Sequence, residues 1–428
     1  MDELINDNRQ ILPIPLSARR GVLYPAFAWS GFTSAFSLVV IGNRLQSGLG
    51  TVDSLFAVVL GCWLLFAYVA AIGFAAGRWG LNSQLMLEAV FGRIGAIIPG
   101  VLLAFLVAGW FAFHVVLTST VLLRVMHIES GVNAAIAVIG LLFAAPVILE
   151  VSRGFRIAAV AFPAMLGFGG VVVATQIVPA WSTLLDGPLQ GALPFGTGVC
   201  VAFGTFAVSG TMTGDIVRYC RTGNEAVQAS AIGFLLSNLP FMLLGVLVGA
   251  ANADVVDLLS GRGWVPNLLL AMVVLSNFAV CDACLANASI TLKRVLPWCP
   301  WSIVAVVATM VAAFLAFSNV VSDVFFWTLF IASVVPPIGG VIIADYYVVR
   351  SRLGFSRARS IRVNLAALFA LCVAAALSFY SWYVFESIFT PLIGVLLASL
   401  VYLCLFAVAP VSLGAGLGPD PLGAEAVD

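Results

Sequence analysis

Charge is what this 428-residue sequence has least of. Only 9% of its residues are Asp, Glu, Lys or Arg, whereas a soluble domain has about 25%. A water-facing surface cannot be built from so few polar groups, which excludes a soluble protein of any fold. The 19 basic and 19 acidic residues cancel, and the basic residues are scattered along the chain. The sequence therefore lacks the basic surface that a nucleic-acid-binding protein needs.

Enzyme motifs and a cysteine framework are missing as well. The sequence has no H-E-x-x-H, no G-x-S-x-G and no glycine-rich loop followed by Lys and Ser or Thr. Its eight cysteines are irregularly spaced and lie mostly in apolar stretches, which is typical of buried thiols. The C-x-x-C pair of Cys281 and Cys284 has no second pair of ligands. We therefore predict neither an enzyme nor a thiolate metal site.

Long apolar runs make up most of the chain. Hydrophobic residues account for 62% of it, and about twelve runs reach the roughly 20 residues that a helix needs to span a bilayer. This pattern predicts an all-α polytopic membrane protein. The runs lie at residues 22–44, 53–77, 97–123, 132–150, 155–178, 195–214, 229–252, 266–292, 301–321, 323–348, 362–385 and 388–411.

The two ends of the chain are more polar than the apolar region between them. We expect one transmembrane transporter domain at 22–412, between a segment at 1–21 and an acidic tail at 413–428. With the N-terminus inside, the inner connections hold all basic residues except Arg44, Arg124 and Arg262. Because basic loops stay in the cytoplasm, both termini are predicted to be cytoplasmic and the protein to lie in the cytoplasmic (inner) membrane.

Tryptophans and acids near the ends of the runs suggest interfacial roles. An indole suits the membrane–water interface, so we expect anchors at Trp79, Trp181, Trp264, Trp298, Trp301, Trp327 and Trp382. A charge near a span end is less costly when it is paired. We therefore expect the ion pairs Asp215–Arg218 and Asp345–Arg350.

Glycine and hydroxyl residues interrupt two of the runs. One interruption covers residues 31–37 in the first run, and the other covers 204–214 in the sixth. Such residues weaken a helix and can satisfy backbone groups where it unwinds. Paired interruptions are typical of inverted-repeat transporters with a midplane site, but small residues also allow close helix packing. In the tenth run, Pro336 and Pro337 predict a hinge or a structural kink.

Three side chains stand out because they lie at membrane depth. Trp110 either packs in the core or offers a stacking face to a planar ligand. His114 lies one turn further on the same helix face, where it acts as a proton carrier, as a hydrogen-bond partner or as a neutral packing residue. Asp282 is the acid placed well inside a run. It could bind a cation, relay a proton or join two helices by a hydrogen bond.

Four motifs indicate a family. They are PLSARRGVL at 15–23, GWF at 109–111, GTMTGDIVR at 210–218 and PPIGGVIIADY at 336–346. Their residues, order and separations resemble those of the nucleobase:cation symporter-1 family, the purine-cytosine permeases. The resemblance extends from about residue 15 to the twelfth run. It implies alternating access and the five-plus-five inverted-repeat, leucine-transporter-like fold, with helices 1 and 6 broken and two extra helices.

The resemblance also implies a substrate site. In such transporters a planar heterocycle stacks between a third-span Trp and a sixth-span aromatic, which here are Trp110 and Phe206. Ser209 then lies beside the unwound sixth-span backbone. An eighth-span amide binds the ring edge in the family; a gapless alignment puts Ser276 at that position, with Asn277 one residue away.

For the coupling cation the resemblance implies the carbonyls of Gly31 and Ser34 together with eighth-span hydroxyls. Where the family's cytosine transporters have Thr-Thr-Asn-Asp-Asn, this chain has Ala-Val-Cys-Asp-Ala at 279–283. Two hydroxyls that Na+ would use are therefore apolar, leaving backbone carbonyls and Asp282. We favour H+ over Na+ as the coupling ion, and expect no other cofactor.

The function implied is import of a nucleobase or a related planar N-heterocycle, driven by a cation gradient. A third-span Gln of the family is Val107 here, and His114 stands where the family's cytosine transporters have Gly, so His114 joins the candidate substrate-binding residues. Two alternatives are a transporter of a thiamine-precursor pyrimidine, such as hydroxymethylpyrimidine, and an uncoupled channel or receptor on the same fold.

Overall fold

The computed structural model describes residues 12–151, 154–184, 192–261, 263–351, 362–385 and 389–408. Every regular element in these ranges is a helix. Most of the expected N-terminal segment and all of the acidic tail at 413–428 lie outside the described residues, so the predicted domain limits stay predictions.

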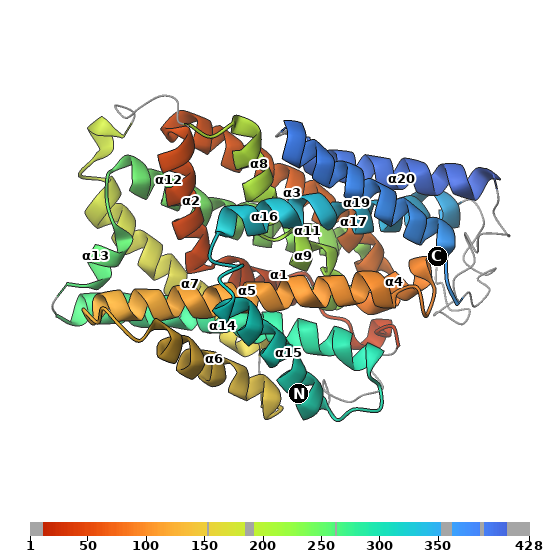
Figure 1. Cartoon of the computed structure of the whole chain (residues 1–428), viewed down its shortest axis with the longest axis horizontal. Helices are drawn as coiled ribbons and strands as arrows, with labels where there is room; N and C mark the ends of the chain where they lie inside the picture. Colours follow the sequence, from red (N-terminus) through yellow and green to blue (C-terminus); the bar gives the residue numbers. More distant parts are fainter. Residues whose placement is uncertain are drawn as a thin grey trace.

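The helices follow the apolar runs in order (Figure 1). Three π-helical stretches, η3 (Val173–Ile177), η5 (Phe234–Asn238) and η6 (Asp345–Arg350), continue or connect α-helices. The α-helices are α1 (Leu23–Thr33), α2 (Phe36–Leu49), α3 (Thr51–Trp79), α4 (Ser83–Phe91), α5 (Ile97–Val125), α6 (Val132–Ile148), α7 (Gly154–Val172), α8 (Phe195–Gly204), α9 (Ala207–Thr211), α10 (Gly214–Val217), α11 (Gly223–Gly233), α12 (Leu239–Ala250), α13 (Val255–Leu259), α14 (Trp264–Val295), α15 (Trp301–Phe317), α16 (Val324–Val334), α17 (Pro336–Ala344), α19 (Leu365–Phe385) and α20 (Thr390–Val408).

The length and the apolar surface of these helices show that the chain is a multi-pass membrane protein. Eight helical segments of the described ranges are long and apolar enough to cross a membrane, and the bent pair of α1 and α2 makes a ninth. Three shorter apolar helices, α6, α8 and α15, occupy the remaining predicted runs. Large apolar side chains such as Phe56 and Phe314 are well exposed, as a lipid-facing surface requires. The count of twelve crossings stays a prediction.

The helices are broken at the glycine and hydroxyl residues, as the sequence predicts. α1 and α2 meet at Ser34 with a bend of 53°. The sixth run is divided into α8, α9 and α10, and the first gap contains Phe206 with φ −129° and ψ 15°. The double proline separates α16 from α17 at Val335. The breaks in the first and sixth runs therefore leave backbone groups without helical partners at membrane depth.

Small residues also pack helices closely, so the two interpretations of the interruptions are not exclusive. α2 lies against α12, where a Cβ on Gly42 would stand 2.1 Å from the carbonyl oxygen of Met242. A Cβ on Gly245 would stand 2.2 Å from the carbonyl oxygen of Val39. Only glycine permits this approach of the two backbones.

α4 and α13 mark opposite ends of the long helix α5 (Figure 1, right and left). At the α13 end, Arg124 pairs with Asp254 at 2.6 Å and with Asp257 at 3.0 Å. The α4 end holds most of the described basic residues. They include Arg19, Arg20, Arg78, Arg93, Arg218, Arg221, Lys293, Arg294 and Arg350.

The tryptophans predicted as anchors differ in exposure, and Trp79, Trp301 and Trp382 are half-buried. Trp181, Trp264 and Trp298 are more than 70% exposed, in line with the predicted interfacial position. Trp327 is only 2% exposed, so its prediction as an anchor is wrong. Its ring lies on α5, 2.1 Å from where a Cβ of Gly109 would stand, because the glycine leaves room for an indole inside the bundle.

Candidate functional site

A small cavity lies where the breaks of the first and sixth runs meet. Its volume is about 10 Å³, close to the lower limit of about 10–15 Å³ for holding one water molecule. Residues of the first, third, sixth and eighth runs line it. They are Phe32, Ser37, Leu38, Ile41, Trp110, His114, Thr205, Phe206, Ser209, Val280 and Cys284.

The two predicted stacking residues, Trp110 and Phe206, both line this cavity and are 5% and 6% exposed. Phe206 lies edge-on to Phe32, with ring centroids 5.5 Å apart, and to Phe234 at 6.1 Å. The buried indole Nε1 of Trp110 has no hydrogen-bond partner among the described residues. Because the cavity is only water-sized, a planar ligand can enter only when one of these rings moves aside.

His114 also lines the cavity, and its two hydrogen bonds define its tautomer. Nδ1 lies 2.8 Å from the carbonyl oxygen of Trp110, which can only accept, so Nδ1 carries the hydrogen. Nε2 is then an acceptor, and the hydroxyl of Ser37 donates to it over 3.0 Å. The hydroxyl hydrogen of Ser37 is thus used within the protein, and toward a ligand Ser37 is an acceptor.

The sixth-span hydroxyls complete the polar lining. Thr205 donates its hydroxyl hydrogen to the carbonyl of Ala202 at 2.7 Å, so it too can only accept from a ligand. Ser209 is 4% exposed and has no hydrogen-bond partner among the described residues, which leaves it free to donate or accept. The hydroxyls that line the cavity therefore offer more acceptors than donors and suit a flat ligand that carries N–H groups.

The two predicted eighth-span partners lie elsewhere. The Ser276 hydroxyl donates to the carbonyl of Ser34 at 3.0 Å and accepts from the backbone N–H of Phe36 at 3.2 Å. Asn277 donates to the hydroxyl of Thr118 at 2.9 Å. Neither side chain lines the cavity, so the structure does not bring them to the stacking residues. From α14 it is Val280 and Cys284 that reach the cavity.

Of the predicted cation-coupling residues, Gly31 and Ser34 lie close together, and Asp282 lies apart from them. Gly31 and Ser34 flank the break of the first run, and the Ser34 hydroxyl lies 3.5 Å from the Gly31 carbonyl oxygen. Asp282 is fully buried in α14. It is two residues from both Val280 and Cys284, which places it on the opposite face of the helix from the cavity.

Solved structures share this fold. Mhp1, a nucleobase-cation-symport-1 family transporter solved in a closed conformation with bromovinylhydantoin bound, matches with a TM-score of 0.78 and 20% identity, covering 94% of this chain and 95% of that chain. A Na+-coupled sialic acid symporter matches with a TM-score of 0.64 and 11% identity, covering 92% and 90%. The fold is therefore the leucine-transporter-like fold of secondary transporters, with helices 1 and 6 broken.

Sequence comparison then gives the family. The family of permeases for cytosine/purines, uracil, thiamine and allantoin matches residues 13–391. The cytosine permease of Escherichia coli strain K12 is 30% identical over 388 residues, 85% of this chain and 87% of the relative. The hydantoin permease of Microbacterium maritypicum is 24% identical over 396 residues, 83% and 80%. The chain belongs to this permease family, the nucleobase:cation symporter-1 family, whose members are transporters and not enzymes.

Proposed function

We propose that this chain imports a nucleobase or a closely related planar N-heterocycle across the cytoplasmic membrane, driven by a cation gradient. The observation that carries the proposal is the cavity between Trp110 and Phe206, with acceptor hydroxyls from Ser37 and Thr205 at its edge. Relatives are named for cytosine, hydantoin and allantoin, which are all small rings with several N–H groups. A thiamine-precursor pyrimidine is a ligand of the same chemistry.

The proposed direction rests on charge. The basic residues of the described chain are concentrated at the α4 end, whereas Arg44 and Arg124 belong to the other side. Because basic connections are retained in the cytoplasm, we place the α4 end and both termini there. The α13 end then faces outward, and substrate enters from that side.

Uptake into proteoliposomes tests the function directly. We expect a labelled heterocycle such as cytosine, uracil or hydantoin to accumulate above its external concentration when an inward cation gradient is imposed. Without a gradient the internal concentration should only equal the external one. A channel cannot exceed equality, so accumulation separates coupled transport from the uncoupled alternative. Equal levels under every gradient, with all three ligands, would contradict the proposal.

The coupling ion is proposed to be H+. The Ser276 hydroxyl donates to the Ser34 carbonyl at the first break, so a side chain of the protein already uses the carbonyl oxygen that a cation there would bind. Ala279 and Val280 bring no oxygen there, and Na+ needs oxygen ligands. Asp282 is then the proposed proton carrier. Since it faces away from the cavity, its titration would act on the substrate through movement of α14.

Replacing His114 is expected to change which ligands are preferred. In His114→Phe the ring remains but Nε2 is lost, and the Ser37 hydroxyl hydrogen becomes available to a ligand. Competition assays should then shift in favour of heterocycles that offer an acceptor in place of an N–H, by about threefold to tenfold for one hydrogen bond.

Ser37→Ala provides the matched background for this test. If His114 acts through Ser37, adding His114→Phe to Ser37→Ala should leave the ranking of competitors nearly unchanged. A ranking that is the same in wild type and in His114→Phe would mean that His114 only packs.

A further inference from the structure

The short helix α4 is unusual because it is completely buried although it is far too short to cross a membrane. All nine of its residues, Ser83–Phe91, are buried. A Cβ on Gly100 of α5 would meet the Gln84 side chain at 3.3 Å and Thr291 of α14 at 3.4 Å. α4 therefore lies against the ends of the same two long helices, α5 and α14, that carry Trp110 and Cys284 into the cavity.

One side of α4 is tied to α14 by an ion pair. The two carboxylate oxygens of Glu88 accept from Nε and Nη2 of Arg294 at 2.5 and 2.8 Å. The Glu88 side chain is 9% exposed and that of Arg294 is 29% exposed, so water screens the pair only weakly. Arg294 is ten residues from the cavity-lining Cys284, about 15 Å along the helix.

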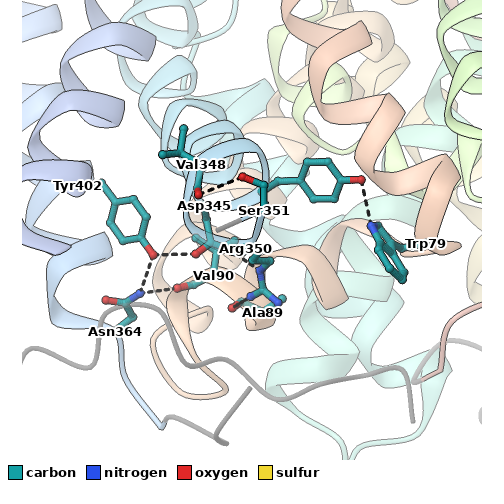
Figure 2. Close-up of polar contacts among 10 residues, drawn as sticks. Trp79, Ala89, Val90, Asp345, Val348, Arg350, Ser351, Asn364 and Tyr402 are labelled. Atoms are coloured by element: carbon teal, nitrogen blue, oxygen red, sulfur yellow. Dashed lines mark hydrogen bonds and ion pairs between the residues drawn. The ribbon is translucent and has the colours of Figure 1, made fainter. Parts of the chain in front are cut away.

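The C-terminal end of α4 is held by η6 and by Asn364, the residue that precedes α19 (Figure 2). The last carbonyls of a helix lack partners within it. Here Arg350 donates to the carbonyl of Ala89, and the Asn364 side chain donates to that of Val90 at 2.8 Å. The expected Asp345–Arg350 ion pair is confirmed at 2.5 Å, and it orients the guanidinium toward α4.

The N-terminal end of α4 is held by the sixth run. The backbone N–H of Ser83 donates to Asp215 of α10 at 3.0 Å. The expected Asp215–Arg218 contact is not among the ion pairs of the described residues. Arg218 is instead 8% exposed, with Nε and Nη1 lacking a hydrogen-bond partner in the described chain. Its Nη2 donates only to the hydroxyl of Tyr219 at 3.3 Å.

Asp215 therefore has one partner in use and another within electrostatic reach. The Ser83 N–H donates to its carboxylate, and the nearby positive charge of Arg218 also stabilises the charged form. If α4 moved away, Asp215 would lose Ser83, while the unpaired N–H groups of Arg218 could replace it. This gives the sixth run two alternative arrangements of its acid, one with α4 in place and one without.

We propose that α4 is the latch that closes the cavity on its α4 side, and that the Glu88–Arg294 and Ser83–Asp215 contacts break before substrate leaves there. The proposal rests on the proposed function for the direction of transport. α4 contacts three of the elements that reach the cavity or continue from it, namely α5, α10 and α14, and its far end is fixed to the tenth run. Opening separates α10 and α14 from α4, and Asp215 turns to Arg218.

Reactivity of the native Cys284 thiol tests the latch without any substrate. Cys284 lines the cavity and is 1% exposed. A charged, membrane-impermeant methanethiosulfonate is added to inside-out or right-side-out vesicles, and modification of the Cys284 peptide is followed by mass spectrometry, with Cys284→Ala confirming the assignment. We expect Glu88→Gln to raise the rate from the α4 side at least fivefold, and Asp215→Asn to raise it too.

Two further variants control the interpretation. The swapped pair Glu88→Arg with Arg294→Glu should return the labelling rate toward wild type. If Glu88→Gln proves too unstable to isolate, Arg294→Lys takes its place. Because Lys keeps the charge, this variant should raise the labelling rate by an intermediate amount. Arg124→Gln breaks the ion pair at the opposite end and should not raise labelling from the α4 side.

Unchanged labelling from the α4 side in Glu88→Gln and Asp215→Asn, or in Arg294→Lys where Glu88→Gln cannot be isolated, overturns the latch. An increase that the charge swap does not reverse overturns the role of the ion pair. Because no heterocycle is used, a failed uptake assay with responsive labelling would refute the proposed function alone, and the reverse result would refute the latch alone.

Discussion

Replacing Trp110 by alanine is expected to weaken binding of the transported heterocycle about tenfold or more, and Phe206→Ala should do the same. Both rings line the cavity at the break of the sixth run. Stacking of a base on an aromatic side chain contributes about 1–3 kcal/mol, as measured by alanine substitution, and 1.4 kcal/mol corresponds to a tenfold change in Kd. Equilibrium binding of labelled ligand to the purified protein measures the effect.

Matched substitutions separate a stacking role from a general loss of packing. Phe203 lies one turn before Phe206, is 1% exposed and packs against Tyr68 away from the cavity. Phe203→Ala should therefore lower thermal stability through the space it leaves while changing Kd much less. If Trp110→Ala is folded and binds the ligand as tightly as wild type, the two rings do not form the stacking site.

Much of the fold could be predicted from the sequence, because bilayer crossing demands long apolar runs and helix breaks demand particular residues. Gly31 and Ser34 mark the first break, and the double proline at Pro336 marks the division of the tenth run. α4 was not predicted, because its nine residues are too short to register as a span. Its burial depends on Arg294 and Asn364, which lie more than 200 residues further along the chain.

The candidate site was predictable where a residue type or the family resemblance points to a position, but not where the rotation of a helix decides. Trp110 and His114 stand out by residue type at membrane depth, Phe206 and Ser209 follow from the resemblance, and all four line the cavity. On α14 a shift of one residue rotates a side chain by about 100°, so a gapless alignment cannot determine that Ser276 bonds Ser34 at the first break while its neighbour Asn277 bonds Thr118.

Ser37 shows another limit of prediction from the sequence. It was visible as one of several hydroxyl residues in the first break, but its importance comes from the hydrogen bond to His114, 77 residues away. Hydroxyl residues at a helix break are interchangeable by composition, and only the positions of α2 and α5 in the folded protein select the one that reaches the imidazole. A histidine at membrane depth was the signal that a hydrogen-bond partner had to exist nearby.

Asp282→Asn is expected to abolish concentrative uptake while leaving exchange of labelled for unlabelled substrate across the membrane. A carboxylate wholly out of water is costly unless a proton or a partner neutralises it, and Asp282 is fully buried in α14. An amide of the same shape cannot change its charge, so it cannot couple transport to a proton gradient. Exchange needs no net coupling and should persist. Asp53→Asn, at the start of α3 and away from the cavity, is the control and should accumulate substrate normally.

The ion itself is identified in vesicles at fixed pH by replacing Na+ with choline. Ser276 already bonds the Ser34 carbonyl and the Phe36 N–H, and the two following positions on that face, Ala279 and Val280, have no hydroxyl to offer Na+. We therefore expect uptake to continue in choline and to collapse with a proton-dissipating ionophore. The opposite pattern, dependence on Na+ with no response to the ionophore, would overturn the assignment of H+ as the coupling ion.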